Sequence, residues 1–404
     1  MGASRRVERA QTHPNAGGLA VVAATFVVFG TFWGSWAVAA ADIEDSLGLS
    51  HGGFGLLLSA ALAGAVACNA VGGALAERRG TAPVLAASLA GWAVLLLVSA
   101  ACHPSVPFAV LLVVAMGLGG VVDVVMNVAA TAGLAGRPGA LVRFHATFNA
   151  GAAAGAGVTG LLLASDVSWR WAWLAIGLVA LVVAVRLRGA ELPAGEAGEH
   201  VPLTGALSVL RREGLLLVAT AFAVSSLVEG GVELWGVLFL RTTLPSGLAV
   251  GVTSAVAAYL VATTARSVLG PTVGRRGPVQ GVAAGAGTAM AGILVLALAD
   301  SGPVAGLGLV LAAGGISLCW PLLLSLASAD RARPGAVVGA VTAVGYTGFV
   351  VGPTVVGALA AGLGLRAGLV LLAGFAAFVA AAPALSGAVV GRDHGAAHRG
   401  RPDL

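Results

Sequence analysis

Two glutamates, Glu229 and Glu233, lie four positions apart inside an apolar stretch that also holds Gly230, Gly231 and Trp235. On a helix this spacing puts both carboxylates on one face, where they repel each other. We therefore expect one of them to hold a proton near neutrality, or the pair to accept a cationic group. The glycines permit a broken helix whose backbone faces a cavity. Alternatively, Glu233 lies near the membrane surface and is simply hydrated there. This explanation fits Glu229 less well, because Glu229 lies deeper in the stretch.

A second polar group joins two neighbouring apolar stretches. Asp123 has Asn127 one turn further along its helix, where the amide can donate to the carboxylate and orient it. His145 opens the next stretch, and Asn149 follows it by one turn. Asp123 and His145 could form a proton-carrying pair. The alternative is a hydrogen-bonded contact that joins the ends of two helices.

Other side chains in apolar stretches have weaker signals. Arg266 is expected to form an ion pair between helices, or to extend toward an interface. Trp33, Trp36 and Tyr346 are either cavity-wall aromatics or packing and interfacial residues. The three cysteines show no metal-ligand spacing, and no zinc-protease or phosphate-binding motif occurs, so we expect no metal, no cofactor and no enzyme.

The elements that carry these residues are predicted to cross a membrane. The chain is 58% hydrophobic and 10% charged, with a mean hydropathy of +0.97, which excludes a soluble protein of 404 residues. Stretches near the roughly 20 residues needed to cross a bilayer recur along it. They are 17–40, 53–76, 82–101, 107–135, 144–165, 171–187, 214–240, 248–269, 279–299, 304–328, 336–360 and 367–390.

The two halves of the chain repeat each other at an offset of 197 residues. Arg78-Arg79-Gly80 then aligns with Arg275-Arg276-Gly277, and Gly117, Gly151, Gly155 and Gly160 align with Gly314, Gly348, Gly352 and Gly357. A duplicated apolar half is typical of secondary transporters. We predict an all-α membrane protein of twelve transmembrane helices in two pseudo-symmetric six-helix bundles, 17–187 and 214–390. A polar linker, 188–213, joins them, and 1–16 and 391–404 are tails.

The arginines predict the orientation of the chain. Three of them, Arg170, Arg241 and Arg366, fall on one side of the predicted membrane. By the positive-inside rule the opposite side, with both termini and the linker, is cytoplasmic in a multi-pass protein of the inner (cytoplasmic) membrane. This rule also explains the net charge of +5 without nucleic acid as a partner. The cytoplasmic set is Arg5, Arg6, Arg9, Arg78, Arg79, Arg137, Arg143, Arg186, Arg188, Arg211, Arg212, Arg275, Arg276, Arg331, Arg333, Arg392, Arg399 and Arg401.

One loop connects these features with a known family. Gly73-Ala-Leu-Ala-Glu77-Arg78-Arg79-Gly80 resembles the G-x-L-A-D-R-x-G loop of the major facilitator superfamily, with Glu in place of Asp. The resemblance implies that Glu77 docks on the start of the eleventh helix, near Ala336, when the cytoplasmic side is closed. Glu77 would then favour the outward-facing state. The alternative is a basic turn that serves topology alone.

A narrower resemblance covers about 30 residues. Asp123-x-x-x-Asn127, followed by Arg143-x-His145-x-x-Phe148-Asn149, resembles the fucose-permease-like branch of the superfamily and its uncharacterised relatives. Arg143 is assigned a structural or ion-pairing role. The first helix holds no carboxylate in this chain, so a sugar substrate does not carry over. A Gly-Pro pair at Gly352 resembles a signature of drug–proton antiporters, but lies in the eleventh helix and not the fifth.

Together these patterns predict a monomeric secondary transporter that moves a small organic solute by alternating access, coupled to protons. Its partners are the lipid bilayer, a small-molecule substrate and protons, and the substrate is expected to be neutral or modestly cationic. Glu229 and then Asp123 are the expected protonatable groups. The alternatives are drug or metabolite efflux by proton antiport instead of sugar-like uptake, and, more remotely, a polytopic sensor.

Overall fold

The computed structural model describes the backbone at residues 16–134, 138–192, 203–245, 247–269, 272, 277–329 and 334–398. Residues 1–15 and 399–404 of the predicted tails and the middle of the linker, 193–202, lie outside these residues. Arg5, Arg6, Arg9, Arg137, Arg275, Arg276, Arg331, Arg333, Arg399 and Arg401 also lie outside them, as do the side chains of Arg143 and Arg392.

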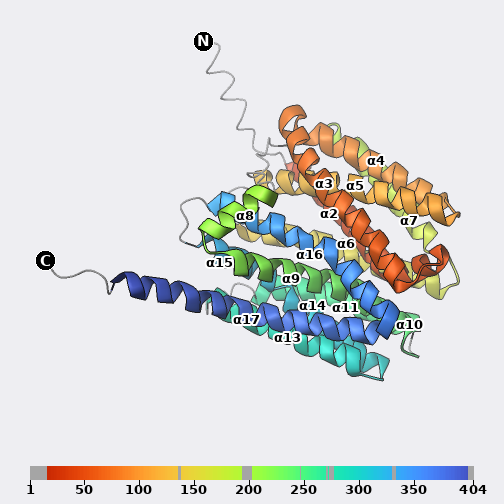
Figure 1. Ribbon diagram of the computed structural model, residues 1–404. Coiled ribbons are helices and arrows are strands. Elements are labelled where there is room, and N and C mark those ends of the chain that lie inside the picture. The colour runs from red at the N-terminus through yellow and green to blue at the C-terminus, as the bar shows by residue number, and fades with distance from the viewer. Residues whose placement is uncertain are drawn as a thin grey trace, which may run out of the picture.

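Within the described residues, twelve helical segments are long and apolar enough to cross a membrane, as predicted (Figure 1). The first six are α2 (Ala16–Leu47), α3 (His51–Arg79), α4 (Thr81–Ala101), α5 (Ser105–Gly133), α6 (Pro138–Ala164) and α7 (Arg170–Leu187). The seventh joins α9 (Leu216–Gly231), a π-helical turn η2 (Val232–Gly236) and α10 (Val237–Thr242), and the eighth joins α11 (Gly247–Thr264) and η3 (Ala265–Leu269). The others are α13 (Pro278–Leu298), α14 (Gly302–Ile316) with α15 (Cys319–Ser328), α16 (Pro334–Leu363) and α17 (Leu365–His398).

The packing repeats in the two halves. In the first half α2 packs on α6, α3 on α5, and α4 on α7. The corresponding pairs of the second half are α9 with α16, α11 with α14, and α13 with α17. Gly80 and Gly277, which the offset of 197 aligns, both precede the next helix with a positive φ, 92° and 114°. The fold is therefore an all-α membrane protein of two pseudo-symmetric bundles.

Aligned glycines explain why these helices pack so closely. A Cβ atom at Gly151 or Gly155 would overlap the backbone carbonyls of Val27 or Thr31 on α2. In the second half, a Cβ atom at Gly348 would overlap the carbonyl of Ala223 on α9. Small residues on one helix thus let the backbone of its partner approach, which drives packing where lipid offers no hydrophobic gain.

Two distal arginines also occupy equivalent places. We call the end of the bundle that carries α8 (Leu203–Arg212) the linker end, and the opposite end the distal end. At the distal end, Arg170 begins α7 and donates to the carbonyls of Ser99, Ala100 and Cys102 at the end of α4. Arg366, near the start of α17, likewise donates to the carbonyl of Ala297 on α13. Both guanidinium groups satisfy carbonyls that a helix end leaves without partners.

The two halves contact each other mainly toward the distal end. Thr354 of α16 donates to Ser59 of α3 over 2.7 Å, and a Cβ atom at Gly55 or Gly357 would overlap the backbone of the facing helix. Arg241 of α10 pairs with Asp42 of α2 over 2.6 Å and also donates to the carbonyl of Val38.

Several helices extend past the predicted spans: α2 ends at Leu47 and not at 40, and α6 begins at Pro138 and not at 144. The linker 188–213 contains the helix α8, whose buried Ala206 and Leu210 face its packing partners, α16 and α9. The last helix continues to His398, past the predicted span end at 390 (Figure 1). Polar residues end a membrane span because they prefer water, but they do not by themselves end a helix.

Candidate functional site

A cavity of about 750 Å³ lies between the two halves. Helices α2 to α6 line it from the first half, and the seventh, eighth, tenth and eleventh spans line it from the second. This volume is in the range of pockets that enclose small organic ligands. Because the two halves meet toward the distal end, the cavity is closed there.

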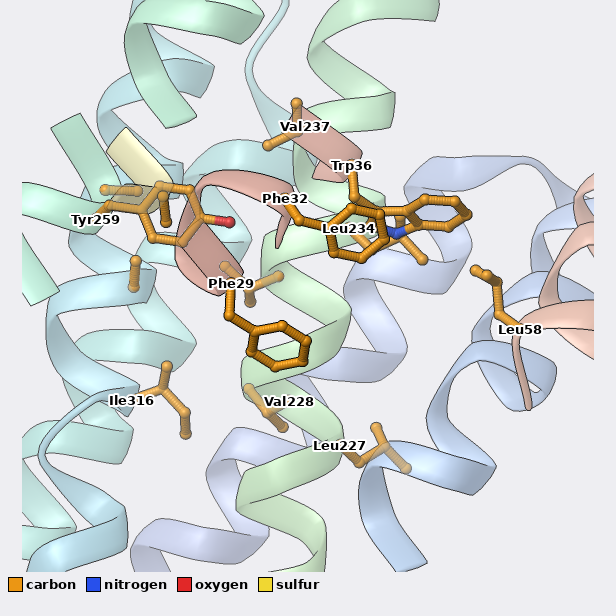
Figure 2. Close-up of a cluster of buried hydrophobic side chains, with 14 of the residues drawn as sticks. Phe29, Phe32, Trp36, Leu58, Leu227, Val228, Leu234, Val237, Tyr259 and Ile316 are labelled. Carbon is orange, nitrogen blue, oxygen red and sulfur yellow. The ribbon is translucent and has the colours of Figure 1, made fainter. Parts of the chain in front are cut away.

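Aromatic side chains line part of the wall and the distal floor of the cavity. Phe29, Phe32 and Trp36 of α2 lie beside Leu227 and Leu234 of the seventh span, and the hydroxyl of Tyr259 points toward them in this view (Figure 2). Across the floor, Trp36 stacks on Phe54 with ring centroids 6.0 Å apart, and Phe54 meets Trp235 edge-on at 6.4 Å. These contacts join both halves through aromatic packing.

Glu229 and Arg266 form an ion pair on the cavity wall. The carboxylate Oε1 of Glu229 accepts from Nη2 of Arg266, whose Nε donates to the carbonyl of Ser317 over 2.9 Å. Three helices of the second half, the seventh, eighth and tenth spans, are thereby tied together. The side chain of Glu229 is 13% exposed, so the pair is largely shielded from solvent.

The second glutamate has a different environment. Glu233 lies deep between the helices, yet its side chain is accessible because it faces the cavity. Within the described residues no hydrogen bond or ion pair engages it, and the nearest charged groups are Glu229 and Arg266. Tyr259 of α11 lies within electrostatic reach. The four-residue spacing thus places both carboxylates in one cavity. Within the described residues, only Glu229 forms an ion pair.

Both π-helical turns lie at these charges. Glu233 is the second residue of η2 and Arg266 the second residue of η3. A π-helical turn inserts one residue into a helix and re-aims the side chains around it, and such turns are frequent at functional sites. The glycines permit a broken helix, but α9 continues through Gly230 and Gly231 and widens only afterwards, at η2. Both glycines are needed for packing, because Cβ atoms there would crowd Phe349 and Leu372.

The polar group of the first half lines the linker-end part of the cavity. Asn127 donates to the carboxylate of Asp123 over 3.2 Å and to its backbone carbonyl over 2.9 Å. His145 also faces the cavity, edge-on to Phe26 at 5.2 Å. No hydrogen bond or ion pair joins Asp123 to His145 within the described residues. The charged side chain that acts on His145 is Arg266, and Asp123 lies within electrostatic reach of Tyr346.

The remaining predicted wall residues also lie at the cavity. Trp33, Trp36 and Tyr346 all line it, and Trp36 is 4% exposed. Asn149 donates to the hydroxyl of Thr263 over 2.8 Å and so bridges α6 and α11 across the two halves. Helix α6 carries Arg143, whose side chain lies outside the described residues.

The motif at residues 73–80 is away from the cavity and is not a loop: Gly73 to Arg79 form the last two turns of α3, and Gly80 alone connects it to α4. Gly73 is buried, whereas Glu77, Arg78 and Arg79 are exposed at the linker end. Within the described part of the chain, Glu77 has no hydrogen-bond or ion-pair partner. Gly80 makes the turn with its positive φ.

Several lining residues were missed from the sequence. Asn69 of α3 lines the cavity and, with its amide oriented to donate, bonds the carbonyls of Ala65 and Gly120. Its signal was a lone amide inside an apolar span. Tyr259 and Trp320 also line the cavity, but an aromatic in an apolar span gives no sign of the side it faces.

The comparisons with known proteins agree with this geometry. The Major Facilitator Superfamily model matches residues 21–347. An uncharacterised MFS-type transporter of Yersinia pestis is 26% identical over 346 residues, which are 83% of this chain and 87% of the relative. An uncharacterised transporter of Sinorhizobium fredii is 28% identical over 376 residues, 89% of this chain and 95% of the relative.

Solved structures share the fold at low identity. The nucleoside transporter NupG superposes with a TM-score of 0.72 at 14% identity, covering 92% of this chain and 99% of that one. A D-xylose–proton symporter superposes with a TM-score of 0.69 at 17% identity, covering 90% of this chain and 96% of that one. The E. coli fucose:proton symporter FucP superposes with a TM-score of 0.57 at 17% identity, covering 89% of this chain and 98% of that one.

Both halves of the repeat, the cavity between them and the matched family model lead to one conclusion. The chain is a non-enzymatic membrane transporter and belongs to the Major Facilitator Superfamily.

Proposed function

We propose that this protein moves a small organic solute across the cytoplasmic membrane by alternating access, with the solute in the cavity between the halves 17–187 and 214–390. The observation that carries the proposal is a cavity closed at the distal end and lined by carboxylates of both halves. An ionisable side chain at membrane depth is costly unless water or a solute reaches it. Two of the structurally similar proteins are proton symporters, one for D-xylose and one for fucose.

The Glu229–Arg266 pair is the proposed proton-dependent switch. A proton on Glu229 removes its negative charge, so the ion pair is lost and Arg266 is released from α9. The seventh and eighth spans then lose one of the contacts that fix their relative position. Asp123, held by Asn127 on the opposite wall, is the second proposed proton carrier. The groups around this switch are Glu233, Tyr259 and His145.

The arginine bias places the linker end in the cytoplasm, with both termini. The distal contacts then close the outer side, and the structure corresponds to an inward-facing state. The exposed Glu77 fits this assignment, because its proposed docking site at the start of α16 is used when the cytoplasmic side is closed.

Transport by purified protein in proteoliposomes tests the proposal. Labelled D-xylose, L-fucose and uridine, which represent the sugar and nucleoside solutes of the similar proteins, and a labelled aromatic organic cation would be assayed with an imposed pH gradient. We expect gradient-driven flux of at least one solute class, and inverting the gradient identifies uptake or efflux. The same vesicles without protein measure leakage.

Variants separate coupling from folding. Glu229→Gln is expected to abolish the stimulation by the pH gradient while facilitated exchange at equal pH continues. Asp300→Asn is the matched control, since Asp300 is an exposed distal carboxylate outside the cavity. Full gradient-driven transport by Glu229→Gln would refute the assigned switch.

A further inference from the structure

We propose that the cavity binds an organic cation with an aromatic or other apolar body, and that Glu233 is the counter-ion of its positive group. The inference rests on the proposed transport function and names the substrate class of that site. It follows from the charge balance of the cavity, from the one carboxylate left without a partner, and from the aromatic wall.

The charge balance favours a cation. The described lining residues contain three carboxylates, Asp123, Glu229 and Glu233, against one guanidinium group, Arg266. Arg266 neutralises Glu229 directly, so Glu233 and Asp123 remain as surplus acidic groups. An uncompensated carboxylate that faces a cavity with mostly apolar walls is stabilised by a bound positive charge.

The same wall disfavours an anion. An anionic solute would need a free cationic side chain, but Arg266 already donates through Nε to Ser317 and through Nη2 to Glu229. A bound anion would compete with Glu229 for the positive charge of Arg266 and would lie near Glu233. Like charges between apolar walls repel.

The two acids have different roles because their surroundings differ. Asp123 is held by the amide of Asn127, which satisfies part of its hydrogen-bonding capacity. Glu233 has no partner within the described residues, and the π-helical turn η2 presents it to the cavity. Glu233 is therefore the carboxylate available to a ligand.

The aromatic wall supplies the rest of the site. Phe29, Phe32, Trp33 and Trp36 of α2 line the cavity together with Trp235, next to Glu233 in η2. Aromatic faces attract cations and also pack against apolar bodies, and tryptophan is the strongest of them.

Three probes of one shape and different charge test the proposal. They are para-phenyl-N-methylpyridinium, its neutral analogue para-phenylpyridine at a pH where it is unprotonated, and the anion para-phenylbenzoate. Binding to the full-length protein in detergent is measured by isothermal titration calorimetry, with empty micelles as the blank. We expect the cation to bind at least about tenfold more tightly than the neutral probe, a difference of roughly 1.4 kcal/mol, and the anion to bind most weakly.

Variants assign the effect to Glu233. Glu233→Gln is expected to remove the preference for the cation over the neutral probe, and Glu233→Asp to keep it. Trp33→Phe should retain more cation binding than Trp33→Leu. Asp300→Asn removes a carboxylate outside the cavity and should leave all three affinities unchanged. If Glu233→Gln does not fold, the ranking of the three probes on the unmodified protein and on Glu233→Asp still decides.

Equal or tighter binding of the neutral or anionic probe overturns the proposal, as does an unchanged cation preference in Glu233→Gln. Failure of the cation site and failure of the transporter are distinguishable. Gradient-driven flux of a sugar or nucleoside without cation preference would overturn only the substrate class. Cation binding that requires Glu233, without flux of any solute, would overturn only the transport proposal.

Discussion

Arg266 of η3 binds Glu229 of α9 from a π-helical turn, while Glu233, one turn beyond Glu229, lies in the other π-helical turn, η2, and has no hydrogen-bond or ion-pair partner within the described residues. Two glutamates with the same sequence signal therefore have different chemical environments. This difference separates the proposed proton switch from the proposed ligand contact, and it makes the pair open to mutational tests.

Removing one member of the pair should destabilise the protein more than removing both. Arg266→Gln leaves Glu229 without a counter-ion beside Glu233, and we expect a loss of roughly 1–3 kcal/mol, reduced from a fully buried pair because water reaches the cavity. Melting temperature in detergent measures it. The double variant Arg266→Gln with Glu229→Gln should recover part of the loss, and a strictly additive double variant would contradict the pairing.

Breaking the distal ion pair should open the distal end. Arg241 of α10 holds Asp42 and the carbonyl of Val38 on α2, across the two halves. Arg241→Gln removes this contact, which should contribute about 1 kcal/mol to the closed state. The ratio of molecules closed at the distal end to molecules open there should therefore fall about fivefold. Spin labels at Asp45→Cys on α2 and Thr243→Cys after α10, in a variant without the native cysteines, measure the distance between the halves by electron paramagnetic resonance.

The matched control for this experiment is Arg366→Gln. Arg366 is also a distal arginine in an ion pair, with Asp300, but both of its partners belong to the second half. We expect it to leave the label distance unchanged. An equal change in both variants would mean that the effect does not come from the contact between halves.

A methyl group at Gly155 should prevent normal packing of α6 on α2. A Cβ atom there overlaps the carbonyl of Thr31, so Gly155→Ala forces the helices apart and should cost about 1–3 kcal/mol or more. Gly64→Ala on α3 is the control, since nothing lies within 4 Å of its Cβ position. Alanine there should be neutral or stabilising by up to about 1 kcal/mol. Monodisperse yield and melting temperature compare the two, and similar behaviour would contradict the close approach.

Loss of the arginine at the end of α4 should destabilise the first half. Arg170→Gln leaves the carbonyls of Ser99, Ala100 and Cys102 with weaker or no donors, at an expected loss of roughly 1–2 kcal/mol. Arg186→Gln, an exposed arginine at the opposite end of α7, serves as control. A melting temperature unchanged by Arg170→Gln would show that water replaces the guanidinium group at these carbonyls.

Much of the fold could be predicted because membrane insertion depends on local composition. The length and apolarity of each stretch indicate a span without knowledge of its neighbours, and the duplicated glycines identify the repeat. The three arginines that depart from the cytoplasmic bias are all used in distal contacts. A count of charges can assign them to a side, but it cannot say that Arg170 and Arg366 bind helix ends while Arg241 joins the halves.

The candidate site was predictable as a set of residues but not as a set of partners. Glu229, Glu233, Asp123 and Arg266 attract notice from sequence alone because a charge in an apolar span needs a reason. Which acid meets Arg266 depends on how the seventh, eighth and tenth spans cross and on two π-helical turns, neither of which has a sequence signature. Sequence thus determined the spans, the repeat and the charges, which depend on local transfer to lipid. Tertiary structure decided the pairing, the closed end and the cavity, because these depend on contacts between helices far apart in the chain.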